Sequence, residues 1–181
     1  VATQPVIEES VNYRVLVPIA NPKTQRGLIQ LAVSIAMNNS PATQSVAIVS
    51  PLSLIQLEEN YAYEGLPVEA DRRIAERSAN LDQLIATLEP EDYRSLVRPI
   101  VEISNDVART TAEIAQRDRV DLVLVGWHRP AFHNSRLGGR VGQILSTAPV
   151  DVAVFVDRQS QRLERLLLPY LSNVHTDLGL E

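Results

Sequence analysis

The loop that follows Gly126 concentrates basic side chains. It carries two histidines and two arginines and no acidic residue: His128, Arg129, His133 and Arg136. The chain as a whole has the opposite balance, with 22 Asp and Glu against 17 Lys and Arg. Because a guanidinium group offers paired N–H donors that match phosphate oxygens, we interpret this loop as part of a binding site for an anionic ligand.

Two glycines follow the basic loop where a helix is expected to begin. Residues 137–148 repeat apolar side chains at helical spacing, and the start of that repeat holds Gly138, Gly139, Arg140 and Val141. Glycine lets a phosphate approach the free backbone N–H groups at the start of a helix. We therefore expect these residues to contact phosphate. For any single arginine here, an exposed side chain without a ligand is the simpler interpretation.

Other kinds of chemistry are disfavoured by the residues present. His128 and His133 have no third metal ligand nearby, so we expect no metal site and either exposed or phosphate-contacting imidazoles. Ser135 lacks the flanking glycines of an exposed nucleophile, and the chain contains no cysteine. We therefore predict that the chain is not an enzyme. Trp127 either stacks on a base or packs against a neighbouring helix.

Apolar runs alternate with amphipathic repeats along the chain. The expected strands are residues 13–19, 45–50, 95–103, 122–125 and 150–156, and the expected helices are residues 24–39, 68–88, 104–119 and 137–148. Thr24 is expected to cap the first helix and Ser104 or Asn105 the third, whereas residues 53–67 are interpreted as a loop with a helical turn. The alternation predicts an α/β fold, a five-stranded doubly wound parallel sheet with helices on both faces.

The expected fold places the candidate site at one end of the sheet. In such sheets a ligand binds beyond the carboxyl ends of the strands, where the strand order reverses. We place that reversal between the first strand and the strand that ends at Gly126, so that the loops 18–22 and 126–129 face each other. This arrangement adds further candidate contacts from the first two strands: Pro18, Ile19, Ala20, Asn21 and Val49.

Composition limits the classes of partner and the number of domains. A formal net charge of -5 and a pI near 5.3 argue against nucleic acid as a partner. No apolar run approaches the length of a membrane span, so we expect a soluble fragment. We interpret residues 1–12 as a linker, 13–157 as one domain and 158–181 as a connector with the truncated start of a second repeat, because residues 165–172 (RLLLPYLS) resemble 14–21 (RVLVPIAN). The chain begins at Val1 without methionine, and we expect sequence upstream.

Residues 13–157 resemble the universal stress protein family. Its ATP-binding members carry glycine, two residues, glycine, nine residues, and glycine followed by Ser or Thr. Gly126 matches the first glycine and Gly139 the third, whereas Arg129 stands at the second glycine and Arg140 at the Ser/Thr. A shift of one residue would use Gly138 and Gly139 instead. The family's nucleoside-contacting Asp after the first strand is matched by Ala20, and these three departures argue against an ordinary ATP site.

The run GGRVGQILSTAPVDVAVFVDR looks most like the tandem stress-protein module at the cytoplasmic C-terminus of monovalent cation/proton antiporters. That resemblance implies a Rossmann-like, cytoplasmic regulatory domain of a membrane transporter. One hypothesis is a sensor of an adenine nucleotide (ATP, ADP, AMP or a cyclic dinucleotide), with Ala20, Asn21 and Val49 near the base and ribose. The other is a structural module that binds no nucleotide and works by dimerising. For either, we expect a homodimer through the last strand, residues 150–156.

Overall fold

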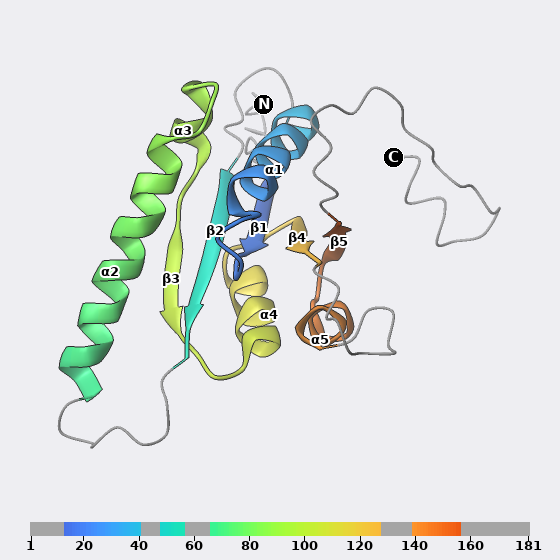
Figure 1. The fold of residues 1–181 in the computed structure, drawn as a ribbon. Helices are drawn as coiled ribbons and strands as arrows, with labels where there is room; N and C mark the ends of the chain where they lie inside the picture. Colours follow the sequence, from blue (N-terminus) through green and yellow to red (C-terminus); the bar gives the residue numbers. More distant parts are fainter. Residues whose placement is uncertain (1–12, 41–47, 57–65, 128–138, 157–181) are drawn as a thin grey trace, which may run out of the picture.

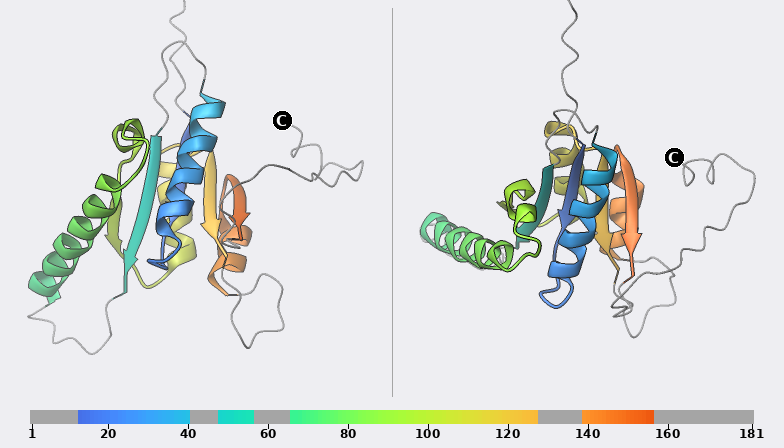
Figure 2. Two further views of the ribbon diagram at one scale, coloured as in Figure 1. Left: turned by 45° about the horizontal axis from the view of Figure 1, so that its top comes forward. Right: turned by 90° about the horizontal axis from the view of Figure 1, so that it is seen from above.

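The computed structural model describes residues 13–40, 48–56, 66–127 and 139–156. Within these residues, five strands form one sheet in which every strand pair is parallel (Figures 1 and 2). Strand β1 (Arg14–Pro18) is central and lies between β2 (Ile48–Ile55) and β4 (Leu122–Gly126). Strands β3 (Ile100–Ile103) and β5 (Asp151–Phe155) form the two edges, which gives the order β3-β2-β1-β4-β5. The predicted fold class is confirmed, and the strand order reverses between β1 and β4 as expected.

Helices cover both faces of the sheet. On one face, α1 (Gln25–Asn39) and α2 (Leu66–Ala86) bury Leu28, Ile29, Leu81 and others against Val15 and Val17. On the other face, α4 (Val107–Arg117) and α5 (Arg140–Thr147) bury Ile114, Ala115 and Ile144 against Leu16 and Val123. The alternation along β1 follows from the strand geometry, in which successive side chains point to opposite faces. A short helix, α3 (Asp92–Leu96), leads into β3.

The second and third strands differ from the sequence-based expectation. Strand β2 runs to Ile55, so the expected loop from Ser53 onwards begins as strand. The residues expected to start the third strand form α3 instead, and β3 begins only at Ile100. Pro99 precedes it and cannot donate a ladder hydrogen bond.

Three further expectations, two about helix caps and one about burial, are corrected by the structure. Asp106 caps α4, in place of Ser104 or Asn105, because its side chain accepts a hydrogen bond of 3.0 Å from the backbone N–H of Arg109. Strand β5, expected to be buried, is only half-buried, since within the described residues it pairs with β4 alone. Thr24 does precede α1, but its hydroxyl donates to the carbonyl oxygen of Asn21 at 3.3 Å and accepts nothing from the helix.

No helix in the described part of the chain combines the length and apolar character needed to cross a membrane. The expectations for residues 1–12 and 158–181, including the second repeat, concern residues outside the described ranges.

Candidate ligand-binding site

The turn after β1 forms one wall of the candidate site. The backbone N–H of Ile19 donates to the carbonyl oxygen of Leu52 at 2.9 Å, which extends the pairing of β1 and β2 past Pro18. Asn21 then closes the turn, with its side-chain oxygen accepting from the N–H of Lys23 at 3.0 Å and its carbonyl from that of Thr24 at 3.2 Å. This turn leaves the residues between β1 and α1 at the carboxyl end of the sheet.

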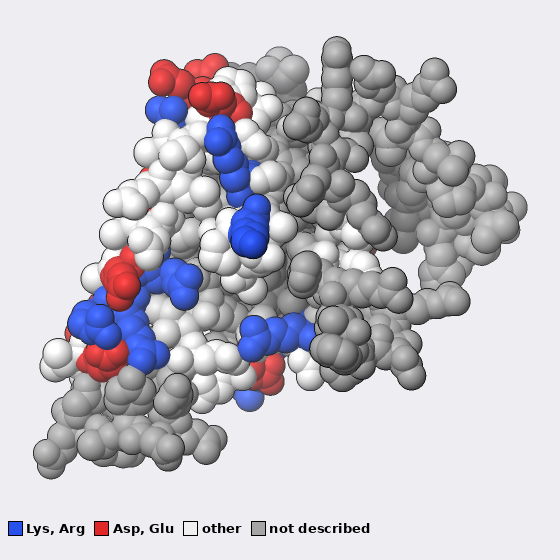
Figure 3. Space-filling model, in the orientation of Figure 1, with Lys and Arg blue, Asp and Glu red and all other residues white. Residues whose placement is uncertain are grey.

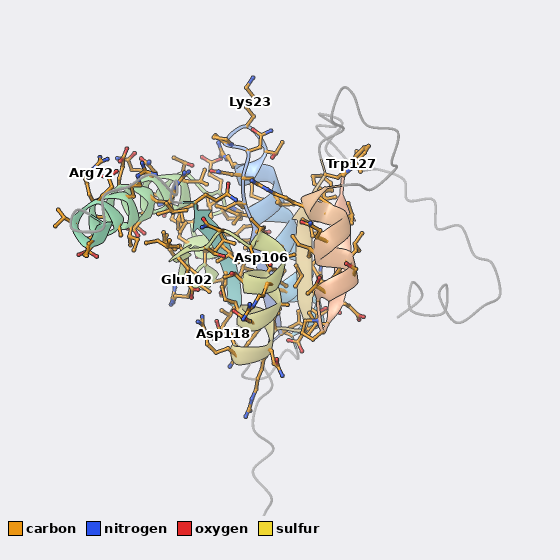
Figure 4. All side chains as sticks on the ribbon, turned by 90° about the horizontal axis from the view of Figure 1, so that it is seen from below. Lys23, Arg72, Glu102, Asp106, Asp118 and Trp127 are labelled. Carbon is orange, nitrogen blue, oxygen red and sulfur yellow. The ribbon has the colours of Figure 1, made fainter. Side chains whose placement is uncertain are left out.

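The end of β4 forms the facing wall. A Cβ at Gly126 would lie 3.4 Å from Cδ2 of Leu28, so the strand passes close to α1 at this point. The backbone N–H of Trp127 donates to the carbonyl oxygen of Phe155 at 2.8 Å, which ties the start of the following loop to β5. Figure 4 looks onto the carboxyl ends of the strands and shows Trp127 beside α5, with Asp106, which precedes α4, nearer the centre.

Between these walls lies a cavity of about 280 Å³. Its lining comes from the carboxyl ends of four strands and from four of the helices: Pro18, Ile19, Ala20, Asn21, Thr24, Gln25, Leu28, Leu52, Ser53, Leu54, Arg77, Val107, Val125, Gly126, Trp127, Arg140, Val141, Ile144 and Phe155. Most of these side chains are apolar. The charged lining residues are Arg77 and Arg140, and no described carboxylate lines the cavity. The cavity therefore combines apolar walls with a cationic rim.

The start of α5 brings Arg140 to this rim. Gly139, which precedes the helix, has a φ of 72° and a ψ of -145°. Residues that carry a Cβ rarely adopt this backbone conformation. Arg140 follows as the first residue of α5 and donates a hydrogen bond of 3.0 Å from its guanidinium Nη2 to the side-chain oxygen of Gln56. That contact links α5 to the end of β2.

A second cavity, of about 500 Å³, adjoins the first. The two share Leu54, Arg77, Val107 and Arg140 in their linings. The second one is more polar and is also lined by Ile55, Gln56, Arg72, Arg73, Glu76 and Asn80. Figure 3 shows acidic and basic side chains intermixed over this part of α2. Its outer wall is therefore a charged helix surface.

Ion pairs occupy part of that helix surface. Glu69 accepts from Arg72 and from Arg73, each at 2.7 Å, and these hydrogen bonds lower the pKa of its carboxyl group from 4.5 to about 2. Glu76 lies 3.5 Å from Arg72. Arg77 differs from these two arginines, because its side chain makes no hydrogen bond or ion pair with any described residue, and it has no acid three or four positions away.

The structure brings together eight of the predicted site residues in the first cavity: Pro18, Ile19, Ala20, Asn21, Gly126, Trp127, Arg140 and Val141. It does not bring Val49 there, because Val49 is fully buried in the body of β2, beside Val15 of β1. Gly139 is exposed at the start of α5 and lines neither cavity. The remaining candidates lie outside the described residues: His128, Arg129, Arg136 and Gly138.

Sequence reasoning missed the contribution of β2 and α2. Leu52, Ser53 and Leu54 line the cavity because β2 continues five residues past the expected end of the strand at residue 50. Ser53 is buried there, with 4% of its surface exposed. Arg77 was missed because on α2 it resembles the other exposed charges of an amphipathic helix. Its one distinguishing sequence signal is the lack of an acid at the neighbouring helical positions. Among the described residues, no group of three or more His, Asp or Glu could hold a metal ion.

Comparison with known protein families identifies this architecture. The model of the universal stress protein family matches residues 12–155. The chain belongs to the universal stress protein family. The resemblance seen in the sequence is therefore confirmed over the whole of the sheet and the helices that cover it.

The chain is also similar to part of a membrane transporter. The Na(+)/H(+) antiporter NhaS5 of Synechocystis sp. is 26% identical over 160 residues, which is 87% of this chain and 21% of the antiporter. This chain thus spans about a fifth of that relative's length, and the expected similarity to an antiporter module is confirmed.

Solved structures support the fold. The universal stress protein UspA from Lactobacillus plantarum has a TM-score of 0.58 at 17% identity, covering 79% of this chain and 97% of that one. A universal stress family protein from Burkholderia pseudomallei has a TM-score of 0.54 at 18% identity, covering 80% and 96%. At these identities the likeness concerns the fold of the stress protein domain.

Proposed function

We propose that this stress protein domain is a regulatory sensor of an adenine nucleotide, and that it belongs to the cytoplasmic part of a cation/proton antiporter. The observation that carries the proposal is the cavity where the strand order reverses, whose charged lining residues are Arg77 and Arg140. Its volume of about 280 Å³ is near the lower end of the usual range for small-ligand sites, and the adjoining cavity enlarges it.

The residues present fit a nucleotide in two respects. Apolar side chains such as Leu28, Leu52 and Ile144 offer a surface for a base, and the arginines offer donors for phosphate oxygens. Ser53 is a buried residue of the cavity wall and adds a hydroxyl group to the lining. Ala20, at the family's acidic position, offers no contact to a ribose hydroxyl.

The antiporter connection rests on the similarity to NhaS5. In this proposal the domain has two conformations, and only one of them allows transport. A nucleotide that binds one conformation more tightly than the other would shift the equilibrium between them, by as much as the two affinities differ. The chain itself performs no catalysis in this proposal.

The second candidate is a structural module that dimerises without binding a nucleotide. Two observations favour it: Ala20 lacks the carboxylate, and the outer edge of β5 has no strand partner among the described residues. This candidate predicts that nucleotides leave the stability of the domain unchanged.

Thermal unfolding with ATP, ADP, AMP and cyclic dinucleotides separates the two candidates. A ligand present at about one hundred times its dissociation constant raises the free energy of unfolding by about 2.7 kcal/mol. The sensor predicts such a rise for at least one adenine nucleotide and none for the corresponding pyrimidine nucleotide. An unchanged melting temperature with every nucleotide at millimolar concentration would leave the structural module as the function.

A further inference from the structure

We infer that Arg77 of α2 and Arg140 of α5 form a phosphate clamp, which directs the phosphate chain of a bound nucleotide out of the first cavity and toward α2. This inference rests on the proposed function and deepens it. It assigns a ligand-binding role to α2, and it names the ligand class as nucleoside phosphates with two or more phosphate groups.

The position of the two arginines is the first argument. They are the charged residues of the first cavity, and both also line the second. The other shared lining residues, Leu54 and Val107, are apolar, so in the described structure a charged ligand group passing between the cavities meets these two guanidinium groups. The second cavity, of about 500 Å³, then has room for the outer phosphates.

The state of the two side chains is the second argument. Arg140 is held by a hydrogen bond to Gln56 at 3.0 Å, which leaves its other N–H groups available. Arg77 makes no ion pair with the described residues and follows Arg73 by four positions on the same helix. Arg73 is paired with Glu69 at 2.7 Å, whereas Arg77 has no acid at the corresponding helical positions. Arg77 thus has N–H donors that no described carboxylate occupies.

The start of α5 is the third argument. In the described structure, Gly139 lines neither cavity, and the family's Ser or Thr position holds Arg140. A phosphate chain that leaves the cavity past Leu54 and Val107 therefore meets a guanidinium group where the family pattern has a hydroxyl. A guanidinium on each side can grip two phosphate oxygens at once, which a single hydroxyl cannot.

Calorimetric titration of the chain with adenosine, AMP, ADP, ATP and pyrophosphate tests the clamp. In the wild-type chain, affinity is expected to rise from adenosine to ATP. Arg77→Ala is expected to weaken ATP binding by roughly tenfold or more while leaving adenosine affinity unchanged, and Arg77→Lys should keep part of the phosphate effect. Arg109→Ala is the matched control, because Arg109 is an exposed helical arginine that lines neither cavity.

The outcomes separate this inference from the proposed function. If wild-type chain binds ATP and Arg77→Ala binds it equally well, the clamp is wrong and the nucleotide sensor stands. If no nucleotide binds but pyrophosphate binds in a manner that depends on Arg77, the arginines hold phosphate alone, and both the sensor and the assignment to nucleoside phosphates are wrong. If neither nucleotide nor pyrophosphate binds, both are overturned.

Discussion

The guanidinium Nη2 of Arg140 lies 3.0 Å from the side-chain oxygen of Gln56 and donates a hydrogen bond to it. These residues are 84 positions apart in the chain and join the first residue of α5 to the segment that follows β2. The contact fixes a cationic side chain at the rim of the first cavity. It connects the two elements that the proposed ligand would touch on either side of β1.

Replacing Arg140 should weaken nucleotide binding without unfolding the domain. Arg140→Ala removes a charge-assisted hydrogen bond to a phosphate oxygen, so we expect a loss of roughly 1.5–3 kcal/mol in binding free energy. The melting temperature should be nearly unchanged, because the Arg140 side chain is exposed. Gln56→Ala removes only the group that orients Arg140 and should cost less. Calorimetry measures both, and equal ATP affinities for wild type and Arg140→Ala would remove Arg140 from the site.

Gly139, which precedes α5, and Gly27, which lies inside α1, should respond to alanine in opposite directions. Gly139→Ala forces a Cβ into a backbone conformation with φ of 72° and should destabilise the domain by about 1–3 kcal/mol. Gly27→Ala, inside α1, meets no atom within 4 Å and should stabilise it by roughly 0.5–1 kcal/mol through helix propensity. Denaturant unfolding of the two variants checks this, and a stabilised Gly139→Ala would show that the left-handed conformation at the start of α5 is absent.

Glu69 should contribute to the acid sensitivity of α2. Its hydrogen bonds to Arg72 and Arg73 lower its pKa in the folded chain from 4.5 to about 2. Because the folded-state pKa is depressed, the stabilisation is fully present above about pH 4.5 and is lost as the pH falls through about 2. Exposure to solvent keeps this contribution small.

Glu69→Gln should therefore reduce the loss of stability between these two pH values. Asp71→Asn, on the same helix, serves as the control, because no described arginine is paired with Asp71. Stability measured by denaturant at several acidic pH values would contradict the assignment if both variants followed the wild-type curve.

The free edge of β5 should mediate self-association. Within the described residues β5 pairs only with β4, and an apolar strand edge invites pairing with a second copy. Val154→Lys places a charge on that strand and should shift the chain toward monomer, whereas Ile103→Lys on the opposite edge should not. Sedimentation measures the oligomeric state of each chain at a protein concentration of roughly tens of micromolar, which suits an interface of standard size. A wild-type chain that is entirely monomeric would argue against the dimer.

The fold could be predicted from the sequence where apolar runs are unbroken. β1 and β4 are short apolar runs that end at Pro18 and Gly126, and both were placed within one or two residues of their observed ends. The reversal between them followed from the general behaviour of parallel α/β sheets, and eight candidate residues consequently lie together in one cavity.

The end of β2 could not be predicted because Pro51 resembles a strand breaker. In the structure Pro51 pairs with Val17 of β1, and its missing N–H lies on the side of β3. There it falls between the isolated bridge of Val49 with Val97 and the start of the ladder at Leu52, so the pairing of β2 with β3 is interrupted where Pro51 has no N–H to donate. This local detail decided whether Ser53 was assigned to a loop or to the cavity wall.

The contribution of Arg77 could not be predicted because it depends on long-range packing. An exposed arginine on an amphipathic helix has no local feature that directs it toward a cavity. Arg77 and Arg140 lie far apart in the sequence. The placement of α2 beside the end of β2 brings them to the rim of the same cavity.

Nuclear magnetic resonance titration of the chain with ATP tests the central claim most directly. Trp127 is the single tryptophan, so its indole N–H gives one identifiable resonance at the cavity wall. The nucleotide sensor predicts saturable shifts for this resonance and for the amides of Ala20, Asn21 and Gly126. It predicts none for the amides of Asp118 and Arg119, which lie before β4 at the opposite end of the sheet. The absence of any shift up to millimolar ATP, or shifts confined to residues outside the cavity, would contradict it.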